Sequence, residues 1–355
     1  MVISFKSLCA AALTSIVLIA PAGVEASKCS CVRPTIRREW RTLSVEKRLA
    51  YIDAVKCLMN KAPETSTNDL PGVRSRYDDF VGTHIVQADF AHFVGKFYPY
   101  HRLYLHSWEK ALNTCGWKDG LPYWDWNRDY GTDEDFFNSP LFDEVAGMGG
   151  NGAWVPGNIT HPEPGFPINA PWDMPDRTGG GCIQTGPFAN LTSSFGPHDN
   201  VAYNPEPECV RRDFSPQSFR DITGPDHVKA AMEQVDYGWF GMVTEPSIHA
   251  GGHLGVGGLY GHMADKWASP ADPIFWLHHG NVDRAWWSWQ KRGLKNRVND
   301  ISGPIINFDY ANDFGGNITL DDTIYVGETV RLETTIREVM HIQRGPLCYE
   351  YDELY

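Results

Sequence analysis

Apolar and polar positions recur with a helical period in several stretches of the chain. The segment SVEKRLAYIDAVKCLMN, which begins at Ser44, alternates charged residues with an apolar stripe. Pro99 suits the opening turn of a helix, where its missing N–H costs little. The patterns predict helices over residues 36–61, 101–112, 226–243 and 272–291.

The remaining stretches predict loops and a few short strands. Residues 127–225 are rich in Gly, Pro, Asn and Asp, so they cannot form long helices. Scattered Trp, Phe and Cys residues in this stretch favour ordered loops on a core over a linker. After residue 303, segments such as DTIYVG and TVRLETTI indicate strands. We therefore expect a mainly α fold with long ordered loops, formed as a single domain over residues 27–355.

The N-terminus has the pattern of a secretory signal. Lys6 precedes an apolar stretch over residues 8–20, and Ala26 ends a plausible cleavage site. The alternative is a membrane anchor, but the stretch is short for a span of about 20 residues. We expect residues 1–26 to be removed, leaving a secreted protein without a membrane segment. Three sequons predict N-glycosylation at Asn158, Asn190 and Asn317.

Charge and cysteine content narrow the possible partners and the compartment. The net charge of −13, without a long basic run, argues against nucleic acid or an anionic membrane as partner. Removal of the signal leaves seven cysteines, most of which should pair in an oxidising compartment. They are Cys29, Cys31, Cys57, Cys115, Cys182, Cys209 and Cys348. Because seven is odd, at least one stays free or pairs unusually.

Two groups of histidines are the strongest chemical signal. The candidates are His84, His92 and His101 in one group, and His249, His253 and His279 in the other. Neutral imidazole suits copper, zinc or iron, and the lack of acidic residues at these positions disfavours magnesium and calcium. His249 and His253 share one face of a helix. Ala250 stands where a zinc protease of the HExxH type has Glu.

The last ligand of the second group comes from the adjacent pair His278 and His279. Phe275, His279 and Asp283 share one helical face, which favours His279 and suggests that Asp283 orients the ligand imidazole or a neighbour. His278 would then turn toward the core or another partner. The other histidines are expected to be structural: His106, His161, His198, His227, His262 and His341.

These segments resemble the type-3 copper family of tyrosinases, catechol oxidases and haemocyanins. HIVQADFAHFVGKFYPYHRLYLHSWEKAL and the following LPYWDWNRD are similar to the first copper region. EPSIHAGGHLGVGG and SPADPIFWLHHGNVDRAWWSWQ are similar to the second. The resemblance implies a core of four helices that holds two copper ions, one on each histidine group, with His279 as the third ligand of the second group.

The chain looks most like the short secreted tyrosinase-like subgroup of fungi, and it departs from other family members near the site. CYEYDELY resembles the end of the core domain, so we expect no C-terminal shielding domain. Phe90 replaces the cysteine that forms a thioether in many members, and Ala250 replaces an asparagine common in monophenol-hydroxylating enzymes. Lys266 stands at a position that often gates the site, where it would either favour an acidic substrate or point to solvent. The expected substrate pocket comprises Phe275, Lys266, Ala250 and Leu254.

The resemblance implies a copper-dependent oxidase that uses O₂ to convert o-diphenols to o-quinones. Monophenols and o-aminophenols are further expected substrates, with diphenol oxidation stronger than hydroxylation. Glu245 is the candidate proton acceptor through a water, its alternative role being a carboxylate at a helix terminus. The alternative functions are a tailoring phenol oxidase of a secondary-metabolite or peptide pathway and an oxygen-binding protein. A monomer or small oligomer is expected.

Overall fold

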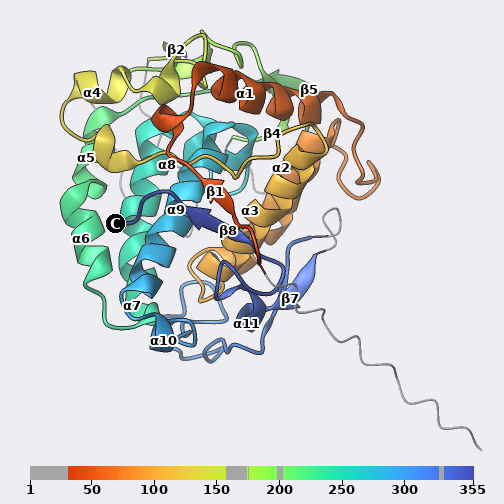
Figure 1. Ribbon diagram of the computed structural model, residues 1–355. Coiled ribbons are helices and arrows are strands. Elements are labelled where there is room, and N and C mark those ends of the chain that lie inside the picture. Colours follow the sequence, from red (N-terminus) through yellow and green to blue (C-terminus); the bar gives the residue numbers. More distant parts are fainter. Residues whose placement is uncertain (1–30, 157–173, 175, 198–202, 328–331) are drawn as a thin grey trace, which may run out of the picture.

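The computed structural model of the chain describes residues 31–156, 174, 176–197, 203–327 and 332–355 (Figure 1). The predicted signal peptide, Cys29 and Asn158 lie outside the described residues, as do His161 and His198. Most of the long Gly- and Pro-rich region predicted as ordered loops is described, and it carries short helices and strands.

Helices form most of the regular structure. They are α1 (Val45–Asn60), α2 (Arg76–Ala91), α3 (Phe97–Asn113), α4 (Asp133–Phe137), α5 (Pro216–Ile222), α6 (Pro225–Met232), α7 (Tyr237–Thr244), α8 (Ala250–Gly257), α9 (Ile274–Lys291), α10 (Leu294–Arg297) and α11 (Ile336–Val339). Single 3₁₀ turns lie at Trp40–Thr42, Trp126–Arg128, Pro140–Phe142, His262–Ala264 and Ser269–Ala271. Helix α9 packs against α3 and α8, and α3 packs against α2. These four helices form the core that positions the histidines.

The helix boundaries follow from side-chain caps. Ser44, Ser75 and Asp236 accept hydrogen bonds from backbone N–H groups in the first turns of α1, α2 and α7. The helix predicted over 226–243 is therefore two helices, because Asp236 starts a new one after α6 ends. The helix predicted over 36–61 begins only at Val45, and the predictions around Pro99 and over 272–291 are confirmed within a few residues. Helix α2 was not predicted.

Strands occur in pairs among the described residues. The strands are β1 (Thr35–Arg37), β2 (Gly152–Trp154), β3 (Gly180–Ile183), β4 (Thr192–Phe195), β5 (Tyr203–Cys209), β6 (Thr323–Tyr325), β7 (Glu333–Thr335) and β8 (Tyr349–Tyr351). The pairs β2–β3, β4–β5 and β6–β7 are antiparallel. Strand β1 pairs in parallel with β8, which brings the two ends of the described chain side by side (Figure 1).

Three disulfides stabilise this arrangement. They join Cys31 to Cys348, Cys57 to Cys115, and Cys182 to Cys209. The first adds a covalent link to the β1–β8 pairing and joins two cysteines that are 317 positions apart in the sequence. Six of the seven cysteines expected after signal removal are thus paired, and the seventh is Cys29.

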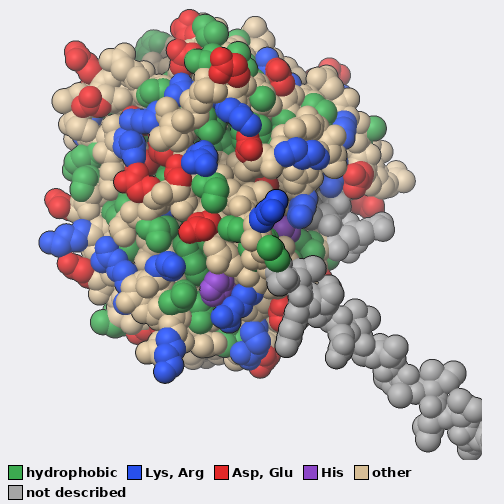
Figure 2. Space-filling view, in the orientation of Figure 1, with side chains coloured by type: hydrophobic (Ala, Val, Ile, Leu, Met, Phe, Trp, Pro, Cys, Tyr) green, Lys and Arg blue, Asp and Glu red, His purple; other side chains and the backbone are tan. Residues whose placement is uncertain are grey.

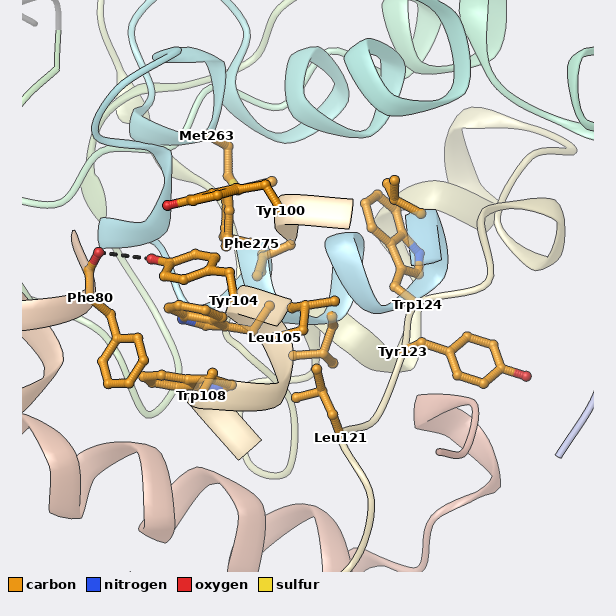
Figure 3. Packing of buried hydrophobic residues seen from close by; sticks show 14 of the residues in the cluster. Phe80, Tyr100, Tyr104, Leu105, Trp108, Leu121, Tyr123, Trp124, Met263 and Phe275 are labelled. Carbon is orange, nitrogen blue, oxygen red and sulfur yellow. Dashed lines mark hydrogen bonds between the residues drawn. The ribbon is translucent and has the colours of Figure 1, made fainter. Parts of the chain in front are cut away.

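Aromatic side chains fill the core beside the histidines. The rings of Trp108 on α3 and Trp276 on α9 stack with centroids 3.9 Å apart. The hydroxyl of Tyr104 donates to the carbonyl of Phe80 at 2.8 Å, and Phe275 lies near Tyr104 (Figure 3). Such rigid rings hold neighbouring helices at defined distances. They give the histidine-bearing helices a stiff support.

A buried ionic cluster joins the ends of the described chain to the core helices. Asp283 on α9 accepts hydrogen bonds from Arg102 Nε at 2.5 Å and from Arg37 Nη1 at 3.1 Å. The hydroxyls of Tyr349 and Tyr351 on β8 donate to the same carboxylate at 2.5 and 2.6 Å. Burial alone would raise the pKa of Asp283, but the two guanidinium groups outweigh it and hold that pKa below its ordinary value.

Acidic and basic side chains are interspersed over the face shown in Figure 2, without a broad basic area. None of the helices in the described part of the chain combines the length and the apolar character that crossing a membrane requires.

Candidate metal centre

The first histidine cluster comes from α2, the residue after it, and α3. His84 lies within α2, His92 is the residue that caps its C-terminus, and His101 lies in the second turn of α3. One ring nitrogen from each of the three lies within 4.8 Å of the others. All three side chains are buried. The geometry is that of three ligands of one ion.

The second cluster depends on an irregular turn. Residues Glu245–His249 form one turn of π-helix between α7 and α8, a feature often found at functional sites. His249 ends this turn and His253 lies on α8, while His278 and His279 lie on α9. Four imidazoles therefore meet here, with one ring nitrogen of each within 4.8 Å of the others.

Hydrogen bonds to backbone carbonyls orient five of the six predicted ligands. In each case Nδ1 of the histidine lies within hydrogen-bond distance of one carbonyl oxygen. The pairs are His84 with Trp267 at 2.7 Å, His92 with Ala88 at 2.9 Å, His101 with Phe97 at 2.8 Å, His249 with Glu245 at 3.0 Å and His253 with Met263 at 2.6 Å. A carbonyl only accepts, so each Nδ1 carries the proton. Each Nε2 then presents a lone pair, as metal ligation requires.

The Nε2 atoms of His84, His101 and His249 are buried and have no hydrogen-bond partner among the described residues. Leaving buried polar atoms unpaired is costly, so such a group indicates a missing ligand. The Nε2 atoms of His253 and His279 lie 3.1 Å apart. Nitrogens bound at about 2.0–2.1 Å to one tetrahedral ion are separated by a similar distance. The residues therefore fit metal ions.

A tryptophan distinguishes the surroundings of His278 from those of His279. The indole N–H of Trp126 donates to Nδ1 of His278 at 3.1 Å. That nitrogen is therefore the acceptor, and the ring proton of neutral His278 lies on Nε2, which leaves no lone pair for a metal. His278 thus has another partner, as expected, although it lies in the same cluster and its Nε2 is also buried without a partner among the described residues. His279 keeps its Nε2 directed at His253.

The two clusters face each other. The rings of His101 and His279 stack with centroids 4.5 Å apart and planes 19° from parallel. Phe275 packs against both clusters, with its ring centroid 4.1 Å from His279 and 5.2 Å from His84. Ions held by the two clusters would therefore share one space with an aromatic wall.

Burial keeps these imidazoles neutral. It lowers the pKa of His84 to about 4 and that of His249 to about 3. For His92, His101 and His279, burial and the neighbouring imidazoles lower the pKa well below the ordinary value. Metal ligation needs the neutral ring, so no proton has to be removed at neutral pH.

Glu245 is a buried carboxylic acid beside this centre. Its Oε1 accepts a hydrogen bond from the backbone N–H of Phe93 at 2.6 Å, one residue after His92. Burial raises the pKa of Glu245 to about 8, although the Phe93 N–H and Lys266 both oppose that rise. Glu245 also lines a cavity of about 340 Å³ between α3, α7 and the segment around residues 302–317.

Three further residues were predicted to line the substrate pocket: Ala250, Leu254 and Lys266. Ala250 is half-buried and follows His249 directly. Leu254 packs in a small apolar cluster with Met174, Leu259 and Tyr260. Lys266 does not point freely to solvent, because its Nζ lies 2.6 Å from the carboxylate of Asp89.

One expectation is wrong, and other contributors were not recognised from sequence. Asp283 does not orient a ligand imidazole, because Arg37, Arg102 and two tyrosines occupy its carboxylate. Gly252 allows α8 to approach α9, since a Cβ there would lie 2.2 Å from the ring of His278. Trp126 lies in LPYWDWNRD, which is similar to part of the first copper region, but its hydrogen bond to His278 was not predicted.

Comparisons with known proteins agree with this geometry. Residues 74–292 match the family model for the common central domain of tyrosinase. Tyrosinase P of Aspergillus terreus is 36% identical over 341 residues, which are 90% of this chain and 93% of that protein. N-acetyl-6-hydroxytryptophan oxidase of Emericella nidulans is 31% identical over 375 residues, covering 96% of this chain and 98% of that protein.

A solved structure shows the same fold. A variant of polyphenol oxidase from Thermothelomyces thermophila superposes with a TM-score of 0.78 and 35% identity, covering 90% of this chain and 89% of that one. Three findings support the same family: the superposition on this structure, the match to the tyrosinase domain, and the two facing histidine clusters. This chain belongs to the tyrosinase family of type-3 dicopper oxidoreductases.

Proposed function

We propose that the six histidines with available Nε2 atoms hold the two copper ions. One ion is held by His84, His92 and His101, and the other by His249, His253 and His279. The observation that carries this assignment is that Nδ1 of five of these rings donates to a backbone carbonyl, which leaves each Nε2 with a lone pair for a metal. His278 takes no part in ligation.

The proposed reaction is the oxidation of o-diphenols to o-quinones. The copper pair supplies oxygen binding and electron transfer, and two diphenols provide the four electrons that reduce O₂ to two waters. In this proposal Phe275 forms the wall under the substrate ring, while Ala250, Leu254 and Lys266 line its approach. An oxygen-uptake assay with 4-methylcatechol tests the proposal, and the absence of uptake by copper-loaded protein would contradict it.

Glu245 is the proposed proton acceptor, acting through a water. Its carboxyl group is held beside the centre by the Phe93 N–H, and its raised pKa of about 8 matches a base that works near neutral pH. The carboxylate form accepts protons and predominates only above that pKa. The proposed base therefore becomes more effective as the pH rises.

We expect kcat for catechol to increase with pH up to about 8 and then to level off, because deprotonation of Glu245 raises the amount of active base. Glu245→Gln should lower kcat by about a hundredfold, which is the low end of the effect of losing a general base. The variant should also lose the increase of kcat with pH. Stopped-flow or oxygen-electrode profiles from pH 5 to 10 measure both effects. An unchanged profile in the variant would exclude Glu245 as the base.

Monophenol hydroxylation is expected to be weaker than diphenol oxidation, since Ala250 offers no side-chain amide to hold the water beside Glu245. The variant Ala250→Asn should raise the ratio of monophenol to diphenol turnover severalfold. Parallel assays with 4-methylphenol and 4-methylcatechol measure that ratio. Faster turnover of the monophenol by the unaltered protein would contradict the expectation.

A tailoring oxidase is the second candidate. It is favoured by the similarity to N-acetyl-6-hydroxytryptophan oxidase over nearly the full length of both chains. The dicopper centre would be the same, and the substrate would be a larger phenol or an o-aminophenol. Comparing kcat/KM for 4-methylcatechol, 2-aminophenol and N-acetyl-6-hydroxytryptophan separates the candidates.

We further propose that the protein is secreted after loss of residues 1–26, leaving one domain over 27–355. The three disulfides support an oxidising compartment. Asn190 and Asn317 are exposed, as glycosylation requires. Intact-mass measurement of protein recovered from culture medium, before and after glycan removal, tests all of these assignments.

A further inference from the structure

The loop between α8 and α9 contacts ligands from both histidine clusters. The carbonyl of Met263 accepts from His253, and the carbonyl of Trp267 accepts from His84. These two acceptors are four residues apart, and each orients a proposed ligand of a different ion. Lys266 lies on this loop, immediately before Trp267. Its backbone is therefore held against the centre.

Lys266 forms an ion pair that joins this loop to α2. Its Nζ lies 2.6 Å from Oδ1 of Asp89, the residue after Ala88, whose carbonyl accepts from His92. The pair therefore bridges two elements that each orient a ligand of the first ion. The ammonium also lies 5.2 Å from the centroid of the Trp267 ring.

The two partners differ sharply in exposure. The Lys266 side chain is 12% exposed, whereas that of Asp89 is 59% exposed. Asp89 can turn into water at little cost, since an ion pair with an exposed partner contributes little. The largely buried ammonium would then need another anion, because burying an unpaired charge is unfavourable. An anionic ligand can therefore replace Asp89.

Asp265 precedes Lys266 in the chain and also carries a carboxylate. The nearby carboxylate of Asp265 accepts the backbone N–H groups of Trp267 and Ala268 at 2.8 and 2.6 Å, so it is engaged within the loop. Asp89 is the carboxylate paired with Lys266 among the described residues. Burial raises the pKa of Glu245, and Lys266 opposes that rise, so the ammonium is within electrostatic reach of the site.

We propose that Lys266 binds the carboxylate of an acidic catechol in place of Asp89 and so selects anionic over neutral or cationic phenols. The proposal rests on the proposed function and names the substrate class of that same site. Val86 and Phe90 on α2 flank Asp89 and are 49% and 70% exposed. In this proposal, their exposed apolar surface contacts the short chain between the phenolic ring and its carboxylate.

The test compares 3,4-dihydroxyhydrocinnamate with its methyl ester and with dopamine. We expect kcat/KM for the acid to exceed that for the ester by about tenfold, with dopamine lowest, and the preference to shrink in 0.5 M salt. Lys266→Met should bring the acid-to-ester ratio to about one. Asp89→Asn should raise the ratio about threefold, because it removes the competing carboxylate.

A matched pair of variants serves as control. Lys47 and Asp119 form an exposed ion pair at α1, so Lys47→Met and Asp119→Asn make the same charge changes elsewhere. Both should leave the acid-to-ester ratio unchanged. Anaerobic titration calorimetry with acid and ester measures the same preference as a ratio of Kd values, without turnover.

The outcomes separate the inference from the function on which it rests. If catechols are oxidised but neither Lys266→Met nor Asp89→Asn changes the ratio, or both lower it, the inference is wrong and the oxidase function stands. If no catechol is oxidised but the acid binds tighter through Lys266 in calorimetry, the proposed reaction is wrong and the anion site stands. Opposite shifts in the two variants support the inference.

Discussion

Replacing His279 with alanine is expected to remove copper from the second cluster and abolish oxidation. The change leaves His249 and His253 as the remaining ligands there, and two imidazoles hold an ion more weakly than three. We expect copper content to fall from about two to about one per chain. Activity should fall by more than about a hundredfold. Loss of a residue that only orients a ligand costs up to about a hundredfold, and loss of the ligand itself should cost more.

The neighbouring residue supplies the control. His278→Gln removes an equally buried imidazole, but His278 Nδ1 accepts from Trp126 and its remaining nitrogen carries the proton. This variant should keep both copper ions. Metal analysis of the two variants after identical dialysis makes the comparison. If His278→Gln lost copper and His279→Ala kept it, the assignment within the adjacent pair would be reversed.

Asp283→Ala is expected to destabilise the fold strongly without removing a copper ligand. The substitution leaves Arg37 and Arg102 as buried charges without their shared carboxylate, which costs about 3–5 kcal/mol. The thermal midpoint should fall by roughly 5–10 °C. Differential scanning calorimetry of the copper-loaded protein measures the change.

Asp321→Ala is the matched control, because Asp321 pairs with Arg337 on the surface and its side chain is 78% exposed. That loss should cost less than about 0.5 kcal/mol. Equal midpoints for the two variants would show that the Asp283 cluster does not hold β1 and β8 against the core helices.

The helical pattern predicted the elements that carry strong local signals. The end of α1 and both limits of α9 were placed within a few residues, but α1 was predicted to start at residue 36 and starts only after its cap at Ser44. Helix α2 was missed although it carries His84 and although Tyr77, Phe80 and Val81 already stand at helical spacing. The break between α6 and α7 was also missed, since the cap at Asp236 lies inside a continuous helical pattern.

The histidines themselves were predictable, but what orients them was not. Three of the hydrogen bonds run to a carbonyl four residues earlier, whereas His84 and His253 bond to Trp267 and Met263 far along the chain. Every residue carries a backbone carbonyl, so the sequence does not show which carbonyls of a loop accept from a histidine. The face that Asp283 shares with His279 was identified correctly, but the residues that occupy its carboxylate come from distant segments.

The copper content of the purified protein, measured by elemental mass spectrometry after exhaustive dialysis, tests the central claim most directly. Two facing histidine clusters, each with three proposed imidazole ligands, predict two copper atoms per chain. One copper atom per chain, or zinc in place of copper at full activity, would contradict the account.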